Sequence, residues 1–337
     1  MAATIKQVAE RAGVSTATVS YVLNGTGVVT EATRQRVLSA VAELHYQPSY
    51  AARSMRSRSR TLGLALPAPA GRLADPAMAE VLAGLSDAAA ARGYSLLLAA
   101  GEAGEDPAAM CLRLIQTGRV DGMVLLELEV DDARARALQE AGLPHVCAGP
   151  PPGESPFVAV DVHDAAAQAV RHLLGLGHRR IALIQLPSDM AESEPRYAGY
   201  VQALEEAGVK PDPQLVVEAG RHEEAGFLAM QELLAAPEPP SAVVAASDEL
   251  AFGAMHALYD AGLEIGRDVS MVGFDDVPLA AHARPALTAM RQPRQRLGEC
   301  LARLLIDTIT GRGRRRESVT LGARLVVRQS SGPVRRD

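Results

Sequence analysis

The sequence is poor in cysteine and lacks both a long apolar run and a leader-like N-terminus. Its three cysteines, Cys111, Cys147 and Cys300, are odd in number and far apart, which indicates single thiols rather than a disulfide framework or a zinc site. No stretch approaches the roughly 18 consecutive apolar residues of a membrane-spanning helix. The first residues, MAATIKQVAERAG, contain no apolar run of signal-peptide type. We therefore expect a cytoplasmic protein without a membrane partner.

Signatures of catalysis and of cofactor binding are also missing. The chain contains no G-x-G-x-x-G, Walker or G-x-S-x-G motif. His163, His172 and His178 lack the spacing of metal ligands, and we interpret them as structural. The sequence therefore predicts no enzyme, no metal and no cofactor.

Positive charge is scarce overall but concentrated at one end. The net charge of the chain is −6, which by itself argues against nucleic-acid binding. Residues 1–60 nevertheless carry eight basic and three acidic side chains, a net +5, so the remainder carries −11. A basic head on an acidic body predicts that only the head meets a polyanion.

The head contains three short runs with apolar residues at helical spacing. These residues are Ile5, Val8, Ala9 and Ala12 in the first run, Val19, Val22 and Leu23 in the second, and Val37, Ala40, Val41 and Leu44 in the third. Gly13 separates the first two runs, and Ser15 can cap the second helix. Asn24 and Gly25 can end that helix, and Thr30 can cap the third. The pattern predicts an all-α helix-turn-helix unit.

The second helix of such a unit enters the major groove of DNA. If its apolar residues face inward, the outward positions are Thr16, Ala17, Ser20, Tyr21 and Asn24. Thr16 can hydrogen-bond a base edge, Ala17 can contact a thymine methyl, and Tyr21 can reach a base or a phosphate. In the alternative interpretation, Thr16 and Ala17 only begin a helix and Tyr21 only packs.

The basic segment YQPSYAARSMRSRSR, residues 46–60, follows the head. Pro48 suits the first turn of a helix that would be too short to be stable alone. A helix that folds on DNA could insert Met55 into the minor groove, with Arg53 and Arg56 on phosphates. The alternative is a solvated linker.

Residues 4–64 resemble the N-terminal signature of the LacI/GalR family of bacterial transcription regulators. The resemblance rests on TIKQVAERAGVSTATVSYVLNG, VTEATRQRVLSAVAELHYQP and AARSMRSRSRTLGL. It implies that Thr16, Ala17 and Tyr21 occupy the main base-reading positions. It also implies that Met55 takes the place of the usual hinge-helix leucine at the central base step. A tyrosine at position 21, where many members have arginine or histidine, leaves the operator sequence open.

From residue 62 onward, short apolar runs of buried-strand type alternate with helical stretches. The runs are 62–67, 94–100, 122–126, 181–186, 242–246 and 268–274, and the helical stretches include 77–92, 106–117, 164–176, 195–207, 222–235 and 249–262. This alternation is typical of parallel sheets with helices on both faces. The length of the body requires two such doubly wound sheets.

Polar residues follow several of these runs. Ligands of doubly wound sheets bind at the carboxyl ends of the strands, so these residues are candidates for a small-molecule site. The candidates are Asp75, Arg196, Arg221, Ser247, Asp248, Asp275, Gln292 and Arg294. In the alternative interpretation, the aspartates are helix caps and the arginines are solvated.

The body resembles the two-lobed α/β effector-binding core that the family shares with periplasmic binding proteins. The resemblance rests on GHRRIALI, RYAGYVQAL, SDELAFGAM, DVSMVGFDD, PALTAMRQP and RLVVRQSS. It implies that Arg196 binds effector hydroxyls or carboxylates and that Asp275 accepts hydrogen bonds from the effector. Ser247 and Asp248 match a pair that is more often Asn-Asp.

Two departures from the family pattern bear on the effector. Arg221 stands where many members have an aromatic residue, and Gly149 stands where sugar-binding members often have an aspartate. With Arg196 and Arg294 nearby, these departures suggest an effector with a carboxylate or phosphate, held by arginine forks. The competing hypothesis is an ordinary sugar, with Arg221 pointing to solvent.

We expect residues 1–47 to form the helix-turn-helix domain, 48–61 the hinge helix and linker, and 62–337 the effector-binding and dimerisation core. Within the core, the N-lobe comprises about 62–161 plus 292–320 and the C-lobe about 162–291 plus 321–337. The resemblance implies a homodimeric repressor, nucleoid-associated through its near-palindromic double-stranded operator and controlled by a small-molecule effector. It leaves open whether the effector induces or corepresses. The alternatives are a solute-binding protein without a DNA role and an enzyme on a doubly wound fold.

Overall fold

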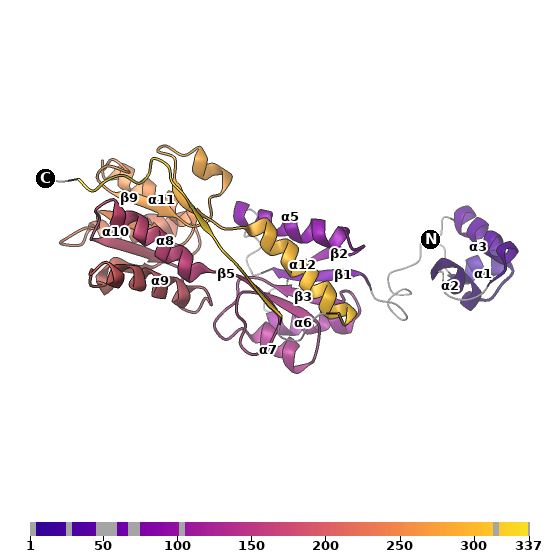
Figure 1. The fold of residues 1–337 in the computed structure, drawn as a ribbon. Helices are drawn as coiled ribbons and strands as arrows, with labels where there is room; N and C mark the ends of the chain where they lie inside the picture. Colours follow the sequence, from indigo (N-terminus) through magenta and orange to yellow (C-terminus); the bar gives the residue numbers. More distant parts are fainter. Residues whose placement is uncertain are drawn as a thin grey trace. The chain divides into compact units, whose positions relative to one another are not determined.

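The computed structural model describes residues 5–24, 29–44, 59–66, 75–100, 105–312 and 317–335. The chain divides into two compact units, Met1–Ser59 and Arg60–Asp337, each with its own contacts (Figure 1). The candidates Arg53, Met55 and Arg56 and the side chain of Asn24 lie outside the described residues. In the part of the chain that is described, no helix has the length and apolar character needed to cross a membrane.

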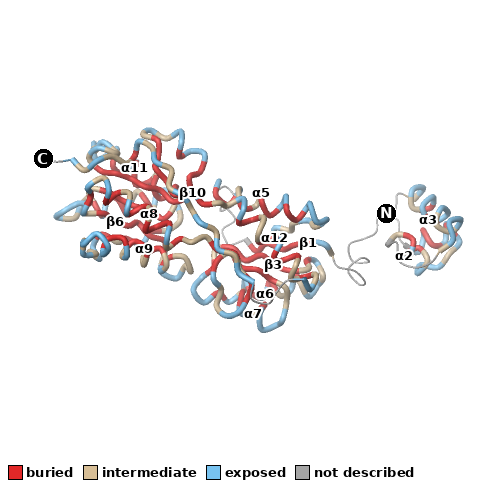
Figure 2. Tube along the Cα trace, in the orientation of Figure 1, coloured by how far each residue is buried: buried red, intermediate tan, exposed pale blue. Residues whose placement is uncertain are grey.

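The described residues of the first unit form three helices, as the sequence predicts for this part of the head. They are α1 (Ile5–Ala12), α2 (Thr16–Asn24) and α3 (Glu31–Glu43). Gly13 adopts a φ of +63° in the turn between α1 and α2, a conformation that glycine takes without strain. The helices enclose a small core of Val8, Ala9, Ala12, Val19, Val22, Val37 and Ala40, which is visible as the buried interior of this unit in Figure 2. The helix-turn-helix prediction is therefore confirmed.

The second unit begins with a six-stranded sheet in the order β11-β5-β4-β3-β1-β2. The strands are β1 (Thr61–Leu66), β2 (Ser95–Ala100), β3 (Gly122–Leu125), β4 (His145–Ala148), β5 (Phe157–Val160) and β11 (Ser318–Leu321). All of its strand pairs are parallel. We call this sheet and its helices the first lobe.

Helices cover both faces of the first sheet. They are α5 (Pro76–Ala90), α6 (Pro107–Gln116), α7 (Ala133–Glu140) and α12 (Arg294–Thr310). Apolar residues of α5 and α12 pack with Leu62, Leu64 and Val124 in one core cluster. Residues of α6 and α7 pack with Met123 and Leu125 in another cluster. Successive side chains of a strand point to opposite faces, so the two clusters lie on the two sides of the sheet.

The second lobe is built on a sheet in the order β12-β10-β9-β8-β6-β7. Its strands are β6 (Ile181–Gln185), β7 (Val216–Glu218), β8 (Ala242–Ala245), β9 (Ser270–Gly273), β10 (Thr288–Arg291) and β12 (Arg324–Val326). Its helices are α8 (Val162–Gly175), α9 (Ser193–Glu206), α10 (Glu223–Leu234) and α11 (Asp248–Asp260). Short 3₁₀ turns lie at Pro213–Leu215 and Pro278–Ala281. The helices α8 and α9 cover one face, and α10 and α11 cover the other. The edge strand β12 pairs antiparallel with β10. The prediction of two parallel sheets is thus confirmed, with one antiparallel edge that it did not include.

The chain crosses between the two lobes three times. The crossings lie between β5 and α8, between β10 and α12, and between β11 and β12. The boundaries of the lobes expected from the sequence fall close to these crossings, and we retain them as a proposal. Each lobe is thus completed by segments distant in sequence: α12 and β11 belong to the first lobe, and β12 belongs to the second.

Candidate functional site

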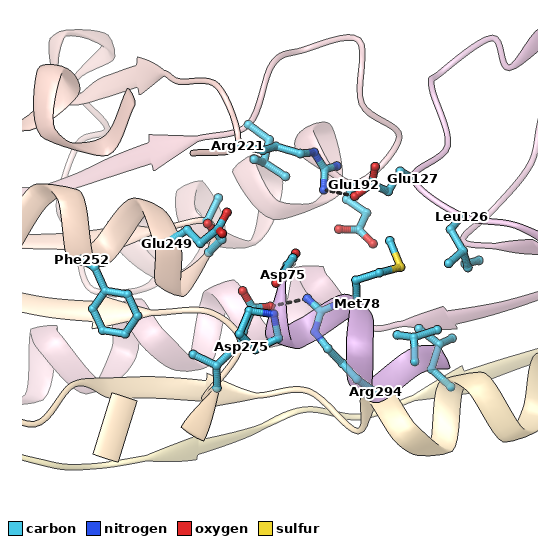
Figure 3. A pocket seen from close by; sticks show the side chains of 18 of the residues that line it. Asp75, Met78, Leu126, Glu127, Glu192, Arg221, Glu249, Phe252, Asp275 and Arg294 are labelled. Carbon is cyan, nitrogen blue, oxygen red and sulfur yellow. Dashed lines mark hydrogen bonds and ion pairs between the residues drawn. The ribbon is translucent and has the colours of Figure 1, made fainter. Parts of the chain in front are cut away.

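A cavity of about 250 Å³ lies between the two lobes of the second unit. Both lobes contribute to its wall, as Figure 3 shows for Asp75 and Glu127 of the first lobe and Arg221 and Asp275 of the second. Six of the eight residues that the sequence singles out line it: Asp75, Arg196, Arg221, Ser247, Asp275 and Arg294. Two of these, Asp75 and Ser247, also cap helices α5 and α11 through their side-chain oxygens. Their roles as caps and as cavity residues are therefore compatible.

Arg196, on α9, is the most deeply buried charged residue of this wall. Its side chain is 1% exposed, and its guanidinium carbon lies 4.7 Å from the centre of the Phe274 ring. Its Nη2 donates to Oε2 of Glu192 at 3.2 Å. Within the described residues, Nε and Nη1 have no hydrogen-bond partner. Buried donors are rarely left without an acceptor, so this arginine is equipped to donate to oxygen atoms of a ligand.

Opposing charges set the pKa values around Arg196. Burial lowers the pKa of the Arg196 guanidinium below its ordinary value, although the carboxylates of Glu192 and Asp275 oppose this shift. Burial would raise the pKa of Glu192, but Arg196, Arg221 and Arg294 outweigh it and hold that pKa below its ordinary value. Glu192 is therefore an anion at neutral pH.

Asp275, in the loop after β9, is held by groups from both lobes. Its Oδ1 pairs with Nη2 of Arg294, which belongs to α12 of the first lobe (Figure 3). Gln292 Nε2 also donates to Oδ1, at 3.1 Å, and the backbone N–H of Asp248 donates to Oδ2 at 3.2 Å. Burial would lower the pKa of Arg294, but Asp275 and Glu192 raise it above its ordinary value. The charged pair thus joins the lobes at the edge of the cavity.

Asp248 and Gln292 are not part of the cavity wall. Asp248 is 1% exposed, and its carboxylate accepts hydrogen bonds from the backbone N–H groups of Phe274, Asp275 and Val277 at 2.8–3.1 Å. Gln292 Nε2 also donates to the carbonyl of Phe274, at 2.7 Å. Both side chains therefore fix the loop that carries Asp275. Burial, together with the neighbouring Asp275, raises the pKa of Asp248 to about 7.

Arg221 follows β7 and faces the cavity rather than solvent (Figure 3). Its Nη1 lies 3.4 Å from Oε1 of Glu127, which follows β3 in the first lobe. The sequence analysis did not select Glu127, nor the other acidic lining residues Glu192, Glu223 and Glu249. A signal for Glu127 was present, because it is the first residue after the buried run GMVLL and therefore stands at a strand end. Its sequence separation from Arg221 concealed the pairing.

Carboxylates outnumber guanidiniums in the described cavity wall. The acidic residues are Asp75, Glu127, Glu192, Glu223, Glu249 and Asp275, and the basic residues are Arg196, Arg221 and Arg294. Each of the three arginines forms an ion pair with one of these carboxylates. The described part of the wall therefore carries more acidic than basic side chains, although its most deeply buried hydrogen-bond donor is the guanidinium of Arg196.

In the first unit, the candidate DNA-contacting residues lie on one side of α2. Val19 and Val22 are buried, whereas Thr16 and Ala17 are exposed, Tyr21 is 47% exposed and Ser20 is half-buried. Ser15 Oγ accepts from the N–H of Thr18 at 3.1 Å, which caps the helix as the sequence predicts. The arrangement presents a short polar and apolar face at the start of the second helix.

A helix-turn-helix unit in one chain with a two-lobed core and a charged interlobe cavity defines a ligand-responsive DNA-binding regulator. Residues 4–49 match the family of bacterial regulatory proteins described as the lacI family. Residues 170–331 match the periplasmic binding protein-like domain. Two relatives among the transcriptional regulators are 38% and 35% identical over 97% and 99% of this chain, so the chain belongs to the LacI family of bacterial transcriptional regulators.

Relatives align over nearly the whole chain. The transcriptional regulator CelR of Thermobifida fusca is 38% identical over 97% of this chain and 98% of its own. The transcriptional repressor PurR of Erwinia tasmaniensis is 35% identical over 99% of this chain and 98% of its own.

Two solved structures have the same fold. The CelR–cellobiose complex has a TM-score of 0.76 and 36% identity, covering 97% of this chain and 99% of that one. The lac repressor dimer bound to operator and the anti-inducer ONPF has a TM-score of 0.85 and 28% identity, covering 98% and 100%. The predicted family, fold class and regulator function are thus confirmed. Family membership also means that the chain is a DNA-binding regulator and not an enzyme, and nothing supports a solute-binding protein without a DNA role.

Proposed function

We propose that this protein is a homodimeric repressor that reads a near-palindromic operator with the exposed face of α2. Thr16, Ala17, Ser20, Tyr21 and Asn24 would contact the major groove, and Arg53, Met55 and Arg56 the minor groove and its phosphates. The exposure of Thr16, Ala17 and Tyr21 supports this assignment. The likeness to an operator-bound lac repressor dimer supports the two-fold arrangement, in which two heads meet two half-sites.

We further propose that the effector is a neutral, hydroxyl-rich molecule of the sugar class, bound in the cavity between the lobes. The observation that carries this proposal is Arg196, whose buried Nε and Nη1 have no acceptor among the described residues. Sugar hydroxyls both accept and donate, so one ligand can serve Arg196 and the carboxylates around it. The complex of the related CelR with cellobiose supports a sugar.

The same wall disfavours the anionic effector considered from the sequence. Among the described lining residues, each arginine already faces a carboxylate, and there are six acidic residues and three basic ones. An anion that accepted hydrogen bonds from Arg196 would still meet repulsion from these carboxylates. A neutral sugar avoids this repulsion, and so does an amino sugar with a positive charge.

Regulation would arise from contacts that the effector makes with both lobes. Asp275 and Arg294 belong to different lobes and form a pair at the cavity, so a ligand that engages them stabilises one angle between the lobes. In the dimer, that angle determines how the two heads are spaced, and hence the affinity for DNA.

Titration calorimetry on the full-length protein tests the effector class. The panel is glucose, cellobiose, glucosamine, glucuronate and glucose 6-phosphate, each also assayed with R196Q. We expect binding of neutral or amino sugars, little binding of the two anions, and loss of binding in R196Q. Binding confined to glucuronate or glucose 6-phosphate would refute the neutral-effector proposal.

Selection of bound duplexes from a random pool tests the operator. We expect an inverted repeat with two half-sites, bound with an affinity that the calorimetrically active sugar changes. Recovery of a direct repeat, or of no preferred sequence, would contradict the proposed mode of binding.

A further inference from the structure

Glu127 is held in an unusual backbone conformation at the rim of the cavity. Its φ is +51°, in the left-handed region that side chains other than those of glycine and asparagine seldom adopt. Nη2 of Arg134 donates to the carbonyls of Leu126 and Glu127 at 3.1 and 3.3 Å. Arg134 is itself fixed by the buried carboxylate of Asp132, at 2.6 Å. A strained conformation persists only where its surroundings determine it, and such positions cluster at ligand sites.

The residues that follow Glu127 are tied to the other lobe through their backbone. The N–H of Ala191 donates to the carbonyl of Leu128 at 2.9 Å, and the N–H of Val130 donates to the carbonyl of Asp189 at 2.7 Å. These two bonds form an isolated antiparallel bridge centred on Glu129 and Met190. Glu127 is thus anchored on one side by Arg134 and on the other by this interlobe bridge.

The carboxylate of Glu127 lies next to Arg221, which stands where many members of the family have an aromatic side chain. The two side chains are 14% and 25% exposed, and Oε1 and Nη1 are 3.4 Å apart (Figure 3). Charges act strongly on one another where water is largely excluded. The pair therefore reduces the positive potential that Arg221 offers to the cavity.

We propose that Glu127 is a specificity-determining residue of the effector site: by pairing with Arg221 across the lobes, it makes the cavity discriminate against anionic effectors. This inference rests on the proposed effector site, because it assigns the selectivity of that same cavity. Glu192 and Asp275 remain in the cavity wall when Glu127 is replaced, so an anion gains affinity relative to a neutral sugar without becoming the preferred ligand.

The test compares wild-type protein with E127Q, E127D, the double variant E127Q/R221Q and the control E129Q, all full-length. Glu129 is an exposed residue two positions further along, and its backbone lies at the centre of the same interlobe bridge. The measured quantity is the ratio of the dissociation constants for glucuronate and glucose. A substitution that only loosened the site would lower the affinity for both ligands and leave the ratio of their dissociation constants unaltered.

We expect E127Q to lower the ratio about tenfold, the size of one charge-assisted hydrogen bond. E127D and E129Q should keep the wild-type ratio, and E127Q/R221Q should return to it. A ratio in E127Q equal to that in E129Q, with native circular dichroism in both, would overturn the proposal.

A second measurement separates this proposal from the sugar hypothesis. Inorganic phosphate is compared with chloride at equal ionic strength, with thermal stability as the readout. Phosphate stabilises folded proteins in general relative to chloride. The expected result is therefore a larger gain in thermal stability for E127Q than for wild type or E127Q/R221Q. If no sugar binds to the wild-type protein but this pattern appears, the proposal of a sugar effector is refuted and the proposed role of Glu127 is supported. If E127Q does not show the pattern, the proposed role of Glu127 is refuted.

Discussion

The guanidinium of Arg294, carried by α12 of the first lobe, pairs with the carboxylate of Asp275 in the second lobe. Both groups line the cavity, and Asp275 has further hydrogen bonds from Gln292 and from the backbone of Asp248. The pair links the ligand site to the relative position of the lobes.

Removal of this pair should weaken both folding and effector binding. R294Q leaves the nearly buried Asp275 carboxylate without its cation, and breaking a buried pair in this way costs about 3–5 kcal/mol. Urea denaturation should show a loss of this order, and calorimetry should show at least about a tenfold loss in sugar affinity. R296Q, which removes an exposed arginine two residues along α12, should change the free energy of unfolding by less than about 0.5 kcal/mol. Equal effects of the two substitutions would contradict this role of Arg294.

Close packing of α5 on α12 should make Gly298 intolerant of alanine. A Cβ at Gly298 would overlap the backbone carbonyl of Val81, and one at Gly84 would overlap that of Gln295. G298A should therefore destabilise the core by about 1–3 kcal/mol through forced separation of the helices. The matched control is G175A, at an exposed helical glycine of α8 with nothing within 4 Å of the added Cβ. It should be neutral or stabilising by up to about 1 kcal/mol. Denaturant midpoints at unchanged m-value provide the comparison.

Burial of histidines should make the core less stable in mild acid. Burial lowers the pKa values of His145, His172 and His178, although the bond to the Gly332 carbonyl partly opposes this shift at His178. Below about pH 6.5 the unfolded chain therefore binds more protons than the folded chain. The free energy of unfolding should fall as pH decreases from about 7.5 to about 5, by up to about 1.4 kcal/mol per pH unit for each histidine.

Asp248, whose pKa is raised, contributes with the opposite sign over the same range. The informative measurement is therefore the difference in slope between wild type and H178Q, determined by urea denaturation at several pH values. H178Q should flatten the decline, whereas H256Q, at a histidine that is 61% exposed, should not. An unchanged slope in H178Q would mean that His178 does not carry the effect.

Tyr21 should influence which operator is preferred. Its side chain is 47% exposed on α2, so Y21A should reduce operator affinity by about 1–3 kcal/mol and relax selectivity at one base pair of each half-site. Y21F removes only the hydroxyl, so it separates the contribution of the hydroxyl to operator affinity from that of the aromatic ring. Fluorescence anisotropy on the selected duplex and its single-base variants provides the measurement. K210A, at an exposed lysine of the core, should leave both affinity and salt dependence unchanged. Parallel losses on all duplexes would instead assign Tyr21 to phosphate contact.

The sequence by itself determined the secondary-structure elements of the head and the fold class of the core. Helical spacing of apolar residues and the turn at Gly13 were sufficient for the three helices of the head, because these signals are local. Alternating apolar runs and helical stretches likewise predicted doubly wound sheets, and strand-end polarity identified Arg196, Asp275 and Arg294 as cavity residues. The charge split and the motif resemblance then led to the correct family.

Only the tertiary structure decided how the charged side chains are paired. Glu127 and Arg221 are 94 residues apart in sequence and meet because the chain crosses between the lobes. Likewise, Asp248 could not be distinguished from a ligand residue until its carboxylate was seen to accept three backbone N–H groups. The electrostatic character of a site depends on distances between groups that are remote in sequence. Each of the three arginines that suggested an anion site is paired with a carboxylate in the described cavity wall.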